Sequence, residues 1–141
     1  MGYRSDVAYV IRFKDKAQCD TFINLQLAKA DKHITGAINE LTRVEDHILG
    51  FHTESVKWYD EYDDVKAHKT LLNEAIGLFS EGVAYSREIP YDDQAGYRFI
   101  RLGEEDEDNV VEDAGNSECL YEYIEWYRKL EVSFKTQPIG E

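Results

Sequence analysis

The first apolar stretch of the chain, VAYVIRF at residues 7–13, alternates as a strand does and is rich in β-branched and aromatic side chains. Both faces defined by the alternation are largely apolar, so the pattern predicts a mostly buried strand. One face carries Val7, Tyr9, Ile11 and Phe13, and the other carries Ala8, Val10 and Arg12.

A helix is predicted to follow this strand. Asp15 and Gln18 have the spacing of a capping box. The helix would run to about Ala30 or His33, and Gly36 would mark a break. Its inner stripe would consist of Phe22, Ile23, Leu27 and Ala30.

A second helix is predicted to begin with Asp63 or Asp64 as its N-cap and to stop at Gly82. Apolar residues recur between these points at spacings of three and four, as one face of a helix requires. That face would consist of Val65, His68, Leu72, Ala75, Ile76 and Phe79.

Three further strands are predicted, one between the two helices and two after the second helix. Residues 47–59 form one strand, with a bulge between Gly50 and Thr53 where the alternation slips. Residues 83–91 and 97–102 form two strands, and residues 92–96 join them as a hairpin.

The last apolar segment, residues 121–134, predicts a long strand with one packed face and one wet face. The packed face carries Ile124, Trp126, Leu130, Val132 and Phe134, and the wet face carries Glu125, Tyr127, Lys129, Glu131 and Ser133.

These elements predict a single α+β domain over residues 1–141, in the order strand, helix, strand, helix and three strands. An antiparallel or mixed sheet of about five strands, with two helices on one face, covers the apolar stripes best. A chain of 141 residues is long enough to bury such a core. The acidic segment 103–118 lies inside this domain, and residues 136–141 are expected to form a frayed tail.

No export signal or membrane span is expected. No apolar run approaches the roughly 20 residues that a membrane helix needs, and the N-terminus has no charged region followed by an apolar one. Cys19 and Cys119 lack a metal-type spacing, so they are expected to be buried or incidental thiols. These features favour the cytoplasm.

The net charge of −13 lies in one part of the chain. Residues 1–50 carry seven Lys/Arg and seven Asp/Glu, whereas residues 51–141 carry nine Lys/Arg and 22 Asp/Glu. A charge of this sign repels phosphate backbones, and no basic footprint is visible. Direct binding to DNA or RNA is therefore not expected.

The densest acidic run places seven carboxylates in the ten positions from Glu104 to Asp113. A solvated loop is one interpretation. A metal site is another, but no frame of the run has the glycine and ligand spacing of a calcium-binding EF-hand loop. A third is mimicry of DNA, since an extended chain advances ~3.3 Å per residue and duplex phosphates are ~3.4 Å apart along a strand.

Two shorter acidic clusters, YDEYDD at residues 59–64 and YDD at residues 91–93, have structural alternatives as a helix cap and a turn. These roles are compatible with a partner-binding surface, because a capping carboxylate can still face solvent. The candidate acidic surface consists of Asp60, Glu61, Asp63, Asp64, Asp92, Asp93, Glu104, Glu105, Asp106, Glu107, Asp108, Glu112 and Asp113.

Besides its acidic residues, the chain is rich in aromatic residues, with ten tyrosines and two tryptophans. Tyr121, Tyr123 and Tyr127 are placed on the wet face of the last predicted strand. Aromatic side chains among carboxylates suit a protein-binding patch. Packing against a helix and a homodimer seam are equally open alternatives.

Residue patterns give no support for catalysis or for a cofactor. His33, His47, His52 and His68 do not form a metal-binding spacing, and His68 is expected to be a core residue. No nucleophile elbow or phosphate-binding glycine loop is present. We expect a binding protein without catalytic residues, metal ligands or cofactors.

The segments MGYRSDVAYVIRF, GYRFIRLGEEDEDN and YIEWYRKLEV resemble a family of small proteins of tailed bacteriophages for which no catalytic residues are known. The likeness covers the first dozen residues and roughly residues 95–132. It implies a phage origin and action in the bacterial cytoplasm.

The expected function is host takeover or anti-defence. The chain would bind and inhibit a bacterial protein that handles nucleic acid, such as gyrase, RNA polymerase, or a restriction or CRISPR effector, by DNA mimicry in one form of the hypothesis. One alternative is an adaptor or inhibitor that binds an unrelated protein through aromatic residues. A second alternative is a divalent-metal-binding enzyme.

Overall fold

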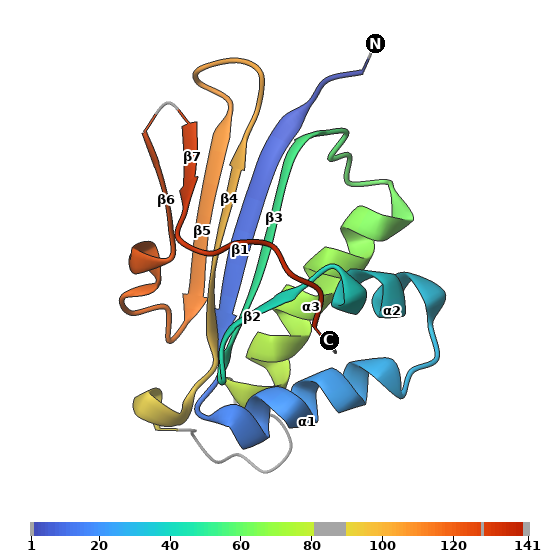
Figure 1. Ribbon diagram of the computed structural model, residues 1–141, viewed down its shortest axis with the longest axis vertical. Coiled ribbons are helices and arrows are strands. Elements are labelled where there is room, and N and C mark those ends of the chain that lie inside the picture. The colour runs from blue at the N-terminus through green and yellow to red at the C-terminus, as the bar shows by residue number, and fades with distance from the viewer. Residues whose placement is uncertain (1, 81–89, 128, 140–141) are drawn as a thin grey trace.

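The structure, a computed structural model, describes residues 2–80, 90–127 and 129–139 and has three layers (Figure 1). Helices cover one face of a five-stranded antiparallel sheet, and a two-stranded hairpin covers the other. The predicted α+β class is confirmed. The sheet has the order β2-β3-β1-β4-β5 and comprises β1 (Ser5–Arg12), β2 (Thr42–Glu45), β3 (Ile48–Val56), β4 (Gly96–Leu102) and β5 (Asn109–Gly115).

Strand β1 is the centre of the sheet and pairs with β3 on one side and β4 on the other. Its two faces contribute to two separate apolar clusters, as the alternation predicts. Val7, Tyr9 and Ile11 belong to the cluster on the helix side, and Ala8 and Val10 belong to the cluster under the hairpin.

Two helices stand where one was predicted: α1 (Lys16–Leu27) and α2 (Lys32–Asn39). Asp15 caps α1, and Gln18 Oε1 accepts from the N–H of Lys14, one residue before the position that a capping box uses. The expected break at Gly36 is wrong, because this glycine lies inside α2 with open space around it. The chain breaks earlier instead, since Asp31 caps α2 by accepting from the N–H groups of His33 and Ile34.

Helix α3 (Asp63–Phe79) matches the second predicted helix, but its N-cap is Tyr62 rather than an aspartate. Asp63 and Asp64 occupy the first turn, where negative charge interacts favourably with the helix dipole. Of the predicted stripe, Val65, His68, Leu72 and Ala75 are buried. The expected stop at Gly82 lies outside the described residues.

The strand predicted over residues 47–59 is β3, and the strand that precedes it and pairs with it, β2, was not predicted. The bulge lies at Thr53–Val56, opposite Ser5 and Val7, rather than at Gly50–Thr53. Ser55 adopts a left-handed conformation there, with φ of 54°.

The predicted strand over residues 83–91 lies largely outside the described residues. Its described end is not a strand, because Tyr91–Asp93 form a 3₁₀ turn, η1.

The acidic run is not one solvated loop, because its second half forms strand β5. Only residues 103–108 are loop, and Gly103 N–H donates to the Asp108 carbonyl at 2.7 Å. At the other end Asn116 N–H donates to the Ala95 carbonyl at 3.1 Å. Since bonded pairs alternate along an antiparallel ladder, the backbone groups of Asn109, Val111 and Asp113 face away from β4.

The long C-terminal strand predicted over residues 121–134 is a hairpin, of β6 (Ile124–Tyr127) and β7 (Lys129–Val132). It follows a second 3₁₀ turn, η2 (Leu120–Glu122). The prediction of its packed face is nevertheless confirmed. The residues packed into the cluster under the hairpin include Ile124, Trp126, Leu130, Val132 and Phe134.

The tail after β7 has no regular structure, but it crosses to the helix side of the sheet (Figure 1). Gln137 N–H donates to Thr42 Oγ1 at 2.9 Å, and Ile139 packs against the helix-side cluster. The described part of the tail is therefore attached at two points, in contrast to the frayed end that the sequence suggested.

The helix-side cluster encloses a polar pair. The Tyr9 hydroxyl lies 2.6 Å from His68 Nδ1, and both side chains are almost completely buried. Burial raises the pKa of Tyr9 well above its usual range, so the hydroxyl keeps its proton and donates to Nδ1. His68 Nε2 lies 3.4 Å from Glu40 Oε1, and the Phe51 ring is tilted against the His68 ring, with their centroids 4.2 Å apart.

We predict that Tyr9→Phe lowers the free energy of unfolding by about 1–3 kcal/mol, because it leaves His68 Nδ1 buried without a donor. Urea denaturation measures this loss. Tyr121→Phe is the matched control, since that side chain is 57% exposed and its change should stay within about 0.5 kcal/mol. Equal midpoints for both variants would contradict a structural role for the pair.

Candidate functional site

The tip of the β4–β5 hairpin is fixed from within by Asp108. Arg101 binds this carboxylate through both terminal nitrogens, at 2.7 and 3.3 Å, and the Tyr3 hydroxyl donates to it at 2.6 Å. Hydrogen bonds from Arg101 and then Tyr3 lower the pKa of Asp108 to about 2. Asp108 was expected to contact a partner, but the structure places it as the internal anchor of the loop.

The four acids before this anchor are exposed. Glu104 accepts from the N–H of Arg4 at 3.0 Å, and the N–H of Glu105 donates to the Tyr3 hydroxyl at 3.2 Å. None of the ion pairs between described residues involves Glu105, Asp106 or Glu107. We call Glu104–Glu107 the acidic tip.

The two acids on β5 differ from each other. Asp113 is bound by Arg98 at 2.9 Å, and Arg98 also binds Glu125 of β6 at 3.0 Å, so this cluster links the hairpin layer to the sheet. Glu112 lies on the opposite face, paired in register with Phe99, and is exposed without a described ion-pair partner. Of the two, only Glu112 is available to a partner.

The remaining predicted acids do not join one surface. Asp60 is paired with Lys69, which lowers the pKa of Asp60, and Asp64 accepts from the N–H of Val65 at 2.9 Å. Asp63 lies 3.5 Å from His33 Nε2, and Glu61 is exposed.

Asp92 and Asp93 lie at the opposite end of β4 from the acidic tip. They precede the first residue of β4, whereas the tip follows its last residue. The length of this strand, roughly 20 Å at ~3.3 Å per residue, therefore separates them from the tip.

A groove lies beside the tip, between α3 and the helix-side face of β4 and β5. It has a volume of about 400 Å³. Trp58, Tyr97 and Phe99 supply its aromatic lining, and Asp60, Lys69, Leu72, Asn73, Arg101, Val110 and Glu112 complete it.

Sequence reasoning missed this groove. The available signal was the spacing of Tyr97, Phe99 and Arg101, which puts all three on one face of β4. The part of the groove that β5 lines could not be predicted, because β5 was not recognised as a strand.

The three tyrosines proposed as an aromatic patch are not equivalent. Tyr121 is exposed, but the Tyr123 hydroxyl donates to Glu45. Burial, and then the hydrogen bond to Glu45, raise the pKa of Tyr123 to about 12. Tyr123 therefore joins the hairpin layer to the sheet, and the side chain of Tyr127 lies outside the described residues.

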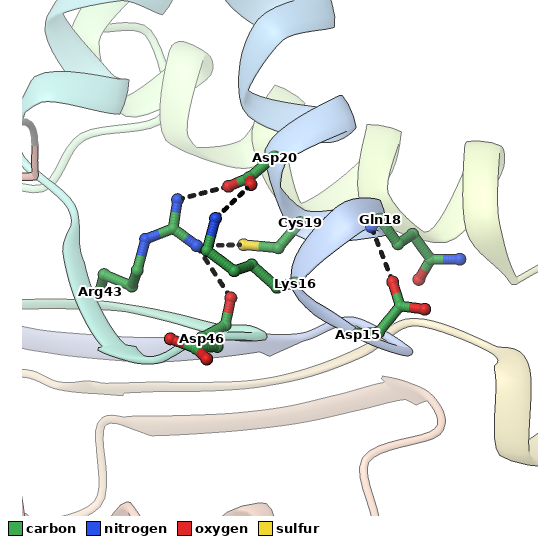
Figure 2. Close-up of polar contacts among 7 residues, drawn as sticks. All are labelled: Asp15, Lys16, Gln18, Cys19, Asp20, Arg43 and Asp46. Carbon is green, nitrogen blue, oxygen red and sulfur yellow. Dashed lines mark hydrogen bonds and ion pairs between the residues drawn. The ribbon is translucent and has the colours of Figure 1, made fainter.

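A separate polar cluster surrounds Cys19 at the start of α1 (Figure 2). Arg43 donates to the Cys19 sulfur at 3.5 Å and to Asp20 at 2.8 Å, and Lys16 also binds Asp20 at 2.7 Å. Burial raises the pKa of the Cys19 thiol to about 11 in spite of Arg43. Figure 2 thus shows an internal brace between α1 and the β2–β3 hairpin rather than an activated nucleophile.

The described part of the chain lacks two other kinds of feature, a metal site and a membrane span. No group of three or more His, Cys, Asp or Glu side chains is arranged there to hold a metal ion. None of its helices has the length and apolar character needed to cross a membrane.

Comparison with protein-family models, curated proteins and solved structures gives no match to this chain. The resemblance to phage proteins stays a prediction, because no match bears on it. The acidic tip and the groove beside it are the features from which function has to be inferred.

We predict that the stabilising effect of Asp108 disappears in acid. Its folded-state pKa of about 2 lies below the unfolded value of ~3.9, so its contribution is complete above about pH 4 and is lost as the pH falls through about 2. Asp108→Asn should therefore lower Tm at pH 7, and its difference from the wild type should shrink between pH 4 and pH 2. Asp106→Asn removes a charge from the same loop and should leave Tm unchanged at pH 7.

The two cysteines should differ sharply in reactivity. Cys119 is exposed and Cys19 is buried, so an aromatic disulfide reagent should label one thiol per folded chain and both thiols after unfolding. Cys119→Ser should abolish labelling of the folded protein, and Cys19→Ser should not alter it. Rapid labelling of Cys19 in the folded chain would contradict its role as a buried brace.

Proposed function

We propose that this chain is a phage-encoded protein that binds and inhibits a bacterial protein which handles DNA or RNA, without catalysis of its own. One observation carries the proposal. The acidic tip presents four consecutive exposed carboxylates on a hairpin that Asp108, Arg101 and Tyr3 hold in place. A fixed array of like charge attracts a basic surface at long range and loses little conformational freedom on binding.

Mimicry of nucleic acid is the form of inhibition that these charges favour. The tip and Glu112 lie on one hairpin and place five carboxylates without a described ion pair within nine consecutive positions, and this local density of negative charge resembles that of a phosphate backbone. A basic groove that binds DNA or RNA would accept such an array and be blocked by it. Gyrase, RNA polymerase and restriction or CRISPR effectors in the host cytoplasm have grooves of this kind.

The alternative, an adaptor that binds through aromatic residues, depends on other parts of the molecule. Of the two proposed tyrosines whose side chains are described, Tyr121 is the exposed one, and it lies in η2 rather than on the β4–β5 hairpin. The salt dependence of binding distinguishes the two functions. Binding through exposed charges weakens as ionic strength rises, and binding through aromatic contacts does not.

The test is a fourfold reversal of the acidic tip, Glu104→Lys, Glu105→Lys, Asp106→Lys and Glu107→Lys. The tagged wild type should capture a nucleic-acid enzyme from nuclease-treated bacterial lysate, release it in moderate salt and lose it to added DNA. Mass spectrometry identifies the partner. The reversed variant should stay folded and capture none of it, because its tip would repel a basic surface.

The matched control carries the same change in charge away from the tip, at Asp46→Lys, Glu118→Lys, Glu122→Lys and Glu131→Lys, all exposed positions. It should retain the partner. Retention by the reversed tip would refute the proposal. Capture of a salt-resistant partner unrelated to nucleic acid would favour the aromatic alternative.

A further inference from the structure

The groove between α3 and the β4–β5 hairpin has an aromatic lining in a fixed geometry. The Trp58 ring lies 6.3 Å from the Phe99 ring, and behind it packs on Phe51 at 5.9 Å and on His68 at 5.6 Å. Tyr97 and Phe99 are two residues apart on one face of β4, and both line the groove. Trp58 is thus held against the sheet, with its neighbours fixed by the strand.

The two cations that line the groove are already neutralised. Lys69 is paired with Asp60, and Arg101 is bound through both terminal nitrogens by Asp108. Glu112 is the lining charge without a described ion-pair partner, and it lies directly across the ladder from Phe99. The charge left for a ligand to neutralise is therefore negative.

The environment of Tyr97 is also consistent with a net negative charge in the groove. Burial, and then the charges of Glu112 and Asp113, raise the pKa of Tyr97. An anion entering the groove would meet these carboxylates, and a neutral apolar group would remove water from Glu112 without giving it a partner, which is unfavourable. A cation avoids both penalties.

We infer that this groove receives an arginine side chain from the partner protein, with the guanidinium stacked on the aromatic lining and hydrogen-bonded to Glu112. A planar guanidinium stacks on aromatic faces and pairs with a carboxylate through two parallel N–H donors, which a lysine ammonium does not do. This inference rests on the proposed function, because a basic partner is what would bring arginine to the site. The acidic tip attracts such a partner, and the groove selects for one residue on it.

The experiment uses N-acetyl-arginine amide as the probe and the citrulline analogue, which has the same shape without the charge, as its control. The indole N–H signal of Trp58 in a ¹H–¹⁵N spectrum, assigned with Trp126→Phe, is the readout. The arginine probe should shift this signal saturably, and the citrulline analogue should bind at least about tenfold more weakly.

Glu112→Gln removes the charge and keeps the shape of an exposed side chain, so the fold should be retained. It should weaken binding of the arginine probe about fivefold. Glu105→Gln removes a charge from the tip and should leave this affinity unchanged.

Equal binding of the two probes, no saturable shift, or no effect of Glu112→Gln would each overturn the inference. Inorganic phosphate as a third probe should give no saturable shift, and a shift competed by phosphate would assign the groove to anions instead. Failure here is distinguishable from failure of the proposed function. The fourfold reversal of the tip should still bind the arginine probe while it loses the lysate partner.

Discussion

The burial of β1 on both faces is the constraint on which the rest of the structure depends. Five consecutive residues from Val7 to Ile11 have no solvent exposure. A strand without a wet face needs a covering layer on each side. The helices supply one layer, and the C-terminal hairpin supplies the other. The tail then passes around the sheet and contacts the helix side, so the two layers are connected by the chain as well as by the core.

The acidity of the chain has two distinct origins within this architecture. Some carboxylates hold elements together: Asp108 fixes the β4–β5 loop, Asp113 ties the sheet to β6 through Arg98, and Asp20 braces α1. Glu105, Asp106, Glu107 and Glu112 make no ion pair among the described residues, and Glu104 only accepts from the N–H of Arg4. Because these roles fall on different residues, the surface charge can be altered while the bonds that maintain the fold stay in place.

Local alternation predicted the buried strand at residues 7–13 and the packed face of the C-terminal segment, but it could not place the turn in that segment. Trp126 and Leu130 pair across the β6–β7 hairpin and are an even number of residues apart, so the alternation continues in phase through the turn. Strand β5 was missed because Glu112 and Asp113 replace the apolar residues expected of a strand. The groove was missed because its lining comes from segments that only the tertiary fold brings together.

The outer edge of β5 has one further consequence. The backbone groups of Asn109, Val111 and Asp113 face away from β4, and no described strand pairs with them, so this edge can pair with the same edge of another copy. In an antiparallel pair centred on Glu112, this carboxylate would face its own counterpart at close range. Like charges that meet across a ladder oppose its formation. The acids of this hairpin thus oppose the pairing of two copies of the chain through this edge.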